Sequence, residues 1–243
     1  MLTSASLQLI AIVTMFIDHL GVYIFHSPIW MRAIGRLAMP LYCFMLSEGF
    51  LHTKDKQRIR YFGRLLAFAF ISQLPFDLAH YAASGGQLSG LPLHLSAGLM
   101  EYKLYLNVIF TLLFGFIAMS AIEYGGWTAI YLLILLLFAE ILGMDYGVYG
   151  VLLVINFYLC SRFLKGEKLK IGRMFGYMFS LFIPMTLMVI IENKPMQLFS
   201  LLAIFPILMY GGKLGHRLPK WFGYVFYPAH LMVIAVICFL LPT

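Results

Sequence analysis

The stretch HTKDKQRIRYFGR at residues 52–64 carries five of the chain's 17 Lys and Arg residues, and long apolar runs lie on both sides of it. Two further stretches repeat this pattern, SRFLKGEKLKIGR at 161–173 and GGKLGHRLPK at 211–220. Together the three stretches contain 13 of the 17 basic residues. Basic clusters that alternate with apolar runs are typical of a polytopic membrane protein, whose cytoplasmic loops carry an excess of Lys and Arg.

The composition supports the same class. Of the 243 residues, 62% are hydrophobic and only 11% are charged, whereas soluble domains carry about 25% charged residues. The lipid bilayer is therefore the expected partner of most of the surface. The net charge of +7 does not indicate a nucleic-acid partner, because the basic residues cluster at the ends of apolar runs. Cys43, Cys160 and Cys238 are isolated in apolar segments and predict packing roles without a disulfide.

We predict an all-α polytopic transmembrane helical bundle that forms a single domain over residues 1–243. About nine spans are expected, and most have the 17–25 residues that cross a bilayer as a helix. One apolar stretch, 127–162, is interrupted at Gly143, Asp145 and Gly147, and we interpret this interruption as a tight turn between two spans. The expected spans are 6–25, 31–51, 61–79, 103–122, 127–143, 146–162, 174–192, 197–211 and 222–241.

The basic stretches also predict the orientation. With nine spans, all three stretches fall on one side of the membrane, and the positive-inside rule makes that side cytoplasmic. The N-terminus is then inside and the C-terminus outside. The longest outside loop, residues 80–102, is a candidate lid or re-entrant segment.

A charged residue within an apolar span is costly, so such residues are the first candidates for function. Asp18 and His19 are neighbours in the first span. Because consecutive residues of a helix point about 100° apart, the two side chains are expected to address different partners. Arg36, in the second span, needs a counter-charge, and Asp18 is the natural candidate. The alternative is that Asp18 and His19 only make polar contacts between helices.

The predicted topology places six polar residues at a similar depth in the outer half: Asp18, His19, Arg36, Asp77, Asn107 and Asp145. This convergence predicts a polar cavity near the mid-plane or open to the outside. Glu48 lies near the inner end of the second span. It is either an interfacial acid or part of an access path from the cytoplasm.

The last span begins with WFGYVFYPAH at residues 221–230. Its aromatic residues, among them Tyr227, suit a membrane interface, and Pro228 is expected to kink the helix. His230 then lies within the membrane, where it can relay a proton, contact an acyl group or bond to a carbonyl. No HxxxH or HExxH spacing occurs, and no metal site is predicted.

Several of these motifs together resemble one known family. They include IAIVTMFIDHLG (10–21), MRAIGRLAMPLYCFMLSEGFLHT (31–53), MDYGVYGVLLV (144–154) and FGYVFYPAHLMVI (222–234). The chain resembles the TraX family, named for a conjugative-plasmid protein implicated in N-terminal acetylation of pilin. The resemblance implies a multi-pass acetyltransferase of the bacterial cytoplasmic (inner) membrane. Its donor would be cytoplasmic acetyl-CoA, and its acceptor an amine or hydroxyl at the outer side, on a pilin, a peptide or a small molecule.

This reading implies roles for individual residues. His19, held and tuned by Asp18, would be the general base. Arg36 or Asn107 would stabilise the oxyanion, and His230 would orient the thioester or protonate the leaving sulfur. The acyl-CoA phosphates would bind to basic residues of the inner loops, and other polar residues would line the cavity. The phosphate-binding candidates are Arg58, Arg60, Arg64, Arg162 and Arg173, and the cavity candidates are Glu48, Asp77, Asn107, Asp145 and Tyr227.

Two other functions fit the same residues. Asp, Arg and His within spans also serve proton-coupled transporters and permeases, although no internal repeat is visible in this sequence. A membrane assembly factor for a secreted peptide or pilin would need no catalysis, and it predicts no binding of CoA.

Overall fold

A computed structural model of the chain describes residues 1–91, 105–125, 128–164, 170–216 and 219–241. Within these ranges the regular structure is helical, apart from two isolated β-bridges, so the predicted all-α class is confirmed. The elements are α1 (Ser4–Tyr23), α2 (Ile29–Gly35), α3 (Ala38–Leu51), α4 (Asp55–Ala83), η1 (Leu88–Gly90), α6 (Val108–Tyr124), α7 (Thr128–Ile141), α8 (Gly147–Phe163), α9 (Lys170–Glu192), η2 (Pro195–Ala203), α10 (Ile204–Leu208) and α11 (Lys220–Leu240).

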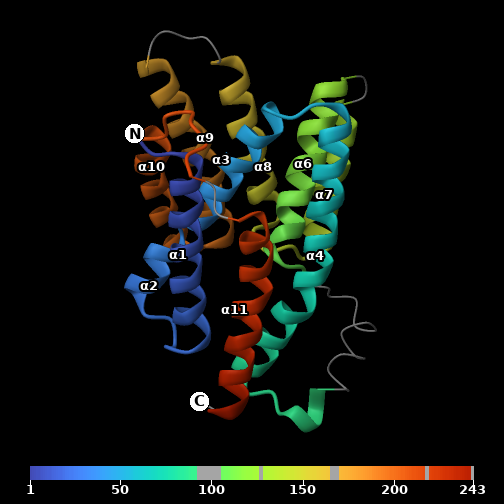
Figure 1. Cartoon of the computed structure of the whole chain (residues 1–243), viewed down its shortest axis with the longest axis vertical. Coiled ribbons are helices and arrows are strands. Elements are labelled where there is room, and N and C mark those ends of the chain that lie inside the picture. Colours follow the sequence, from blue (N-terminus) through green and yellow to red (C-terminus); the bar gives the residue numbers. More distant parts are fainter. Residues whose placement is uncertain (92–104, 126–127, 165–169, 217–218, 242–243) are drawn as a thin grey trace.

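Among the described residues, five helices are long and apolar enough to cross a membrane: Ser4–Tyr23, Ile29–Leu51, Lys56–Ala83, Gly172–Glu192 and Phe222–Leu240. Shorter apolar helices lie at the other predicted spans, in α6, α7, α8 and the combined η2 and α10. The helices lie side by side along one long axis (Figure 1). This arrangement is consistent with a multi-pass membrane protein, and the side that each end faces stays a prediction.

Three helices that carry the candidate residues, α1, α4 and α11, run in the same direction. Successive contacts show this direction. Phe16 and then His19 of α1 meet Phe226 and then His230 of α11. In the same order, Phe68 and Tyr81 of α4 meet Tyr224 and Phe239 of α11. The segment before α11 is bound to the start of α1, since Leu2 N–H donates to Met209 O at 2.7 Å and Ser4 N–H donates to Lys213 O at 2.8 Å. We call the end of the bundle where α4 begins and α8 ends the basic end; it lies uppermost in Figure 1.

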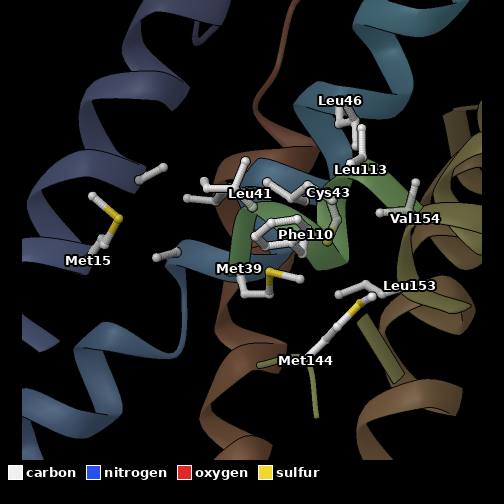
Figure 2. Packing of buried hydrophobic residues seen from close by; sticks show 14 of the residues in the cluster. Met15, Met39, Leu41, Cys43, Leu46, Phe110, Leu113, Met144, Leu153 and Val154 are labelled. Carbon is white, nitrogen blue, oxygen red and sulfur yellow. The ribbon is translucent and has the colours of Figure 1, made fainter. Parts of the chain in front are cut away.

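The core lies where α3, α6 and α8 pack together. Side chains from these helices, such as Leu41, Phe110 and Leu153, fill it, and Met144 contributes from the turn before α8 (Figure 2). Glycine allows the close approach of α6 and α8, because a Cβ at Gly115 would lie 2.8 Å from Val154 Cβ. In a membrane the hydrophobic effect does not drive helices together, because lipid tails are as apolar as the side chains. Small residues at the helix contacts then allow the close packing that stabilises the bundle.

The second predicted span is interrupted, which the sequence analysis did not anticipate. α2 ends at Gly35 and α3 begins at Ala38, with Arg36 and Leu37 in a turn between them. Pro40 has no N–H and cannot donate to the carbonyl of Arg36, so the helical hydrogen-bond series is broken at this position. The interruption places Arg36 at a junction of two helices instead of along one continuous helix.

The other boundaries are partly confirmed. The turn predicted at residues 143–147 exists, with φ values of 58° at Gly143, 64° at Tyr146 and 41° at Gly147. The third span is longer than predicted, since α4 begins before residue 61 and continues beyond 79. Asn107, predicted inside the fourth span, instead precedes α6 as its N-cap. The span predicted at 197–211 is a 3-10 helix followed by the short α10. Residues 92–102 of the predicted lid lie outside the described residues.

Candidate functional site

Asp18 forms the charged centre of the site. Arg32 Nη1 donates to Asp18 Oδ1 at 2.7 Å, and Arg36 Nη2 donates to Asp18 Oδ2 at 2.5 Å. The residues Asp18 and Arg36 are 9% and 7% exposed. The predicted pairing of Asp18 with Arg36 is therefore confirmed, and Arg32 is an additional partner. Two cations on one carboxylate leave a net positive charge within these three groups.

The absence of a side chain at Gly35 makes this contact possible. A Cβ atom at this position would lie 2.2 Å from both Cβ and Oδ1 of Asp18. Non-bonded carbon atoms normally stay about 3.5–4.0 Å apart. Gly35 therefore allows α2 to approach α1 closely enough for both guanidinium groups to reach the same carboxylate.

His19 pairs with His230 and not with Asp18. His19 Nδ1 and His230 Nε2 are 2.7 Å apart, and the two ring planes are 7° from parallel. The expectation that Asp18 holds His19 is wrong, because His19 Nδ1 bonds to His230 and the hydrogen bonds to Asp18 come from arginines. The expectation that the adjacent Asp18 and His19 address different partners is confirmed.

The hydrogen bonds of His230 define the tautomers of the neutral pair. His230 Nδ1 lies 2.7 Å from Phe226 O, and a carbonyl oxygen only accepts, so Nδ1 carries the proton. His230 Nε2 is then an acceptor, and His19 Nδ1 donates to it. His19 Nε2 consequently keeps its lone pair, as a general base requires. His19 is half-buried whereas His230 is buried, so His19 is the more accessible of the two.

Aromatic rings surround the histidine pair. Phe226 lies nearly parallel to His230 with ring centroids 4.9 Å apart, and Phe16 meets the same ring edge-on at 6.0 Å. Tyr227 is buried, and its ring centroid lies 6.1 Å from that of His19 and 5.7 Å from that of His230. Tyr227 was a cavity candidate, and it lies beside the pair as part of this enclosure.

A second polar group adjoins the first through Tyr23, one helical turn after His19. The Tyr23 hydroxyl lies 2.8 Å from His80 Nδ1, and the His80 ring contacts Tyr105 with centroids 5.3 Å apart. Asp145 lies close to Tyr105, and its charge raises the pKa of that phenol. Burial raises the pKa of the Asp145 carboxyl, and the positive charge of Arg36 partly opposes this rise. Of these residues, the sequence analysis had proposed only Asp145.

Asn107 holds three segments together. Its side chain accepts from Ile109 N–H at 2.9 Å as the N-cap of α6. Its Nδ2 donates to Ala69 O at 2.9 Å and to Gln73 Oε1 at 2.8 Å. Because both amide protons are used in these bonds, an oxyanion role for Asn107 is not supported. Gln73 Nε2 also donates to Asp77 Oδ1 at 2.9 Å, which places Asp77 in the same hydrogen-bonded group.

Glu48 lies away from this site. It is near the end of α3, and Arg36 precedes that helix, so the two are separated by about 18 Å along the axis at 1.5 Å per residue. Its backbone carbonyl accepts from His52 at 2.8 Å. Glu48 therefore belongs to the basic end of the bundle and not to the polar group around Asp18. This position agrees with both predicted roles, an interfacial acid or part of an access path from the cytoplasm.

The five arginines proposed for CoA phosphates fall into different environments at or near the basic end. Arg58 and Arg162 share Glu123, at 3.7 Å and 2.9 Å, and Arg58 also lies 4.0 Å from the centroid of the Phe50 ring. In the part of the chain that the structure describes, no acidic group lies within 4.0 Å of the other three. These are Arg60, Arg64 and Arg173.

Sequence reasoning missed Arg32, Tyr23 and His80. Arg32 was not among the proposed site residues, because a long basic side chain near a helix end can extend to the interface. Its position four residues before Arg36 was nevertheless a signal, since such residues share a helix face. Tyr23 follows His19 by the same interval. His80 gave no comparable signal, because it was assigned to a loop.

The fold and the site define an all-helical protein of membrane type with a buried aspartate–arginine group beside a histidine pair. Residues 3–238 match the TraX protein family, and the chain belongs to that family. A similar relative is the "Probable fimbrial assembly protein FimC, serogroup H1" of Dichelobacter nodosus, 31% identical over 96% of this chain and 93% of the relative. An "Uncharacterized protein RP591" of Rickettsia prowazekii (strain Madrid E) is 42% identical over 25% of this chain and 24% of its own length. No solved structure matches the chain.

Proposed function

We propose that this chain is a membrane-embedded acyltransferase that moves an acetyl group from acetyl-CoA to an amine or hydroxyl of an acceptor. The observation that carries the proposal is the hydrogen bond between His19 and His230, which leaves an unprotonated ring nitrogen beside a buried cationic group. Membership of the TraX family supports it. The relative named for fimbrial assembly supports a pilin or peptide N-terminus as the acceptor.

In the proposed reaction, His19 Nε2 removes a proton from the acceptor as its nitrogen or oxygen attacks the thioester carbonyl carbon. The carbonyl oxygen becomes an oxyanion. Arg36 Nε is a buried donor without a hydrogen-bond partner among the described residues, so it is the available group to bind that oxyanion. When the carbon–sulfur bond breaks, His19 returns the proton to the sulfur and free CoA leaves. His230 positions His19 and does not touch the reacting atoms.

The donor phosphates are proposed to bind at the basic end, which faces the cytoplasm in the proposed orientation. Arg60 and Arg173 lack acidic partners within the described ranges. Arg58 and Arg162 would exchange Glu123 for a phosphate, because guanidinium groups bind phosphate oxygens in the same paired geometry as carboxylates. Arg64 lies one helical turn beyond Arg60 on α4, where it lines the groove that is considered separately below.

The test measures thiol release from acetyl-CoA by purified protein with a peptide amine as acceptor, together with CoA binding in the same samples. His19→Ala should retain binding and lose about 10²- to 10⁴-fold in turnover, the range for a general base. His230→Phe should lose about 10- to 100-fold, as positioning partners do. His26→Asn is the matched control, since this exposed histidine lies between α1 and α2, away from the basic end. Asn tolerates its positive φ of 54°, and the variant should keep wild-type turnover.

A second function, that of a non-catalytic assembly factor, is favoured by the printed name of the Dichelobacter relative. It predicts that folded protein neither binds CoA nor releases thiol. Wild-type turnover in His19→Ala would instead contradict the mechanism while leaving the donor proposal intact.

A further inference from the structure

A groove of about 560 Å³ lies between α4 and α11, outside the site described above. Its walls are apolar apart from Arg64 and the Tyr224 hydroxyl. Ile71 and Val225 are 65% and 51% exposed, so the groove opens on the outer surface of the bundle, which faces lipid in a membrane protein. The lining residues are Arg64, Ala67, Phe68, Ile71, Pro75, Tyr224, Val225, Pro228, Ala229 and Met232.

The groove and the histidine pair lie on opposite faces of α11. Val225, Pro228, Ala229 and Met232 have the spacing of a single helix face. His230 follows Pro228 by two residues, which corresponds to about 200° of rotation, and it points toward α1. A thioester held in the groove would therefore be separated from His19 by the body of α11. This separation argues against the acetyl donor as the occupant.

We propose that the groove binds an acyl chain of an anionic phospholipid whose phosphate contacts Arg64. The guanidinium has no acidic partner within 4.0 Å in the described segments, and it lies 5.7 Å from the centroid of the Tyr61 ring. A cation at one end of an apolar, lipid-facing groove complements an anionic headgroup joined to a hydrocarbon chain. The groove is too small for a partner helix, whose diameter with side chains is about 10–12 Å.

The experiment uses the whole protein in a neutral detergent, titrated with dioleoyl phosphatidylglycerol or dioleoyl phosphatidylcholine, with binding followed by native mass spectrometry. Wild type should bind phosphatidylglycerol more tightly than phosphatidylcholine. Arg64→Gln should weaken phosphatidylglycerol binding by about tenfold or more, as expected for one charge-assisted contact, and should remove the preference between the lipids. Arg173→Gln is the matched control, because Arg173 is also an exposed arginine near the basic end, and it should keep the preference.

A second pair of variants tests the groove itself. Ala67→Trp fills the groove and should weaken binding of both lipids, whereas Val236→Trp adds the same bulk at an exposed position of α11 outside it and should not. An unchanged lipid preference in Arg64→Gln would overturn the proposal. So would equal lipid binding by the two tryptophan variants, or dimerisation through this face without bound lipid. If Ala67→Trp does not fold, the Arg64→Gln comparison decides. None of these outcomes depends on acetyl transfer.

Discussion

At the scale of single residues, adjacent side chains serve different contacts. Asp18 and His19 are neighbours, yet the first binds two arginines from the α2–α3 region and the second binds a histidine of α11. The pairing of Asp18 with Arg36 was predictable, because a buried guanidinium needs a counter-charge. The partner of His19 was not, because a neutral histidine can satisfy its hydrogen bonds with many groups and the sequence favours none of them.

Gly35→Ala should destabilise the protein and disrupt the site. A Cβ at this position would lie 2.2 Å from Asp18, and relief of that overlap must separate α1 from α2 at a cost of about 1–3 kcal/mol. Thermal unfolding in detergent should show a lower midpoint for this variant. Gly63→Ala is the matched control, since no atom beyond its own stretch of helix backbone lies within 4 Å of the added carbon. Equal midpoints for the two variants would show that the close approach is not needed.

Asp18→Asn should destabilise more than any other single loss of charge in the described ion pairs. The substitution keeps the shape of the side chain but leaves Arg36 buried without its counter-charge, and breaking a buried pair in this way costs about 3–5 kcal/mol. Glu123→Gln is the comparison, because the Arg162 and Glu123 side chains are 43% and 32% exposed, and an exposed pair contributes about 0–1 kcal/mol. Chemical unfolding of both variants measures the difference, and a larger loss for Glu123→Gln would contradict this ranking.

At the scale of helices, the sequence was informative about which elements exist and less so about how they end. The turn between α7 and α8 was predictable because Gly143, Asp145 and Gly147 interrupt a long apolar run. The break between α2 and α3 was not recognised. Proline removes the hydrogen bond to the carbonyl four residues earlier, so Pro40 breaks the series at Arg36 although Pro40 itself lies inside α3. The N-cap role of Asn107 was missed because its apolar surroundings extended the predicted span across it.

The structural role proposed for Asn107 is separable from a catalytic one. Asn107→Ser should keep the cap on Ile109 N–H and lose the two bonds donated by Nδ2. Asn107→Ala should lose the cap as well, at a further cost of about 1 kcal/mol. Unfolding free energies of both variants test this order. If the role of Asn107 is structural, turnover should fall only as far as the fraction of folded protein falls. A large loss of turnover in stably folded Asn107→Ser protein would show that Asn107 takes part in catalysis.

At the scale of the whole molecule, the site depends on helices that are distant in the sequence. His19 and His230 are separated by 211 positions, and they meet because α1 and α11 run in the same direction side by side (Figure 1). Hydropathy identified both segments but carries no information about which spans are neighbours. The similar depth of the polar residues stays a prediction. The contacts that the structure does show join Asp18 to Arg36, and Asn107 and Asp77 to Gln73.

The orientation of the bundle is testable on α4 alone, because its two ends are separated by about 43 Å at 1.5 Å per residue. In a background in which Cys43, Cys160 and Cys238 are replaced by Ala, a single cysteine is introduced by Lys56→Cys or by Ser84→Cys. Both positions are exposed. A membrane-impermeant maleimide is then applied to right-side-out vesicles, before and after permeabilisation.

The positive-inside rule predicts that Ser84→Cys is labelled in intact vesicles and that Lys56→Cys is labelled only after permeabilisation. Basic residues cluster at the start of α4, with Lys54, Lys56, Arg58 and Arg60 within seven positions, and such segments are retained in the cytoplasm. The reverse pattern would place the basic end outside, where cytoplasmic acetyl-CoA does not reach it, and would contradict the proposed donor route. Labelling of both positions in intact vesicles would show that α4 does not cross the membrane.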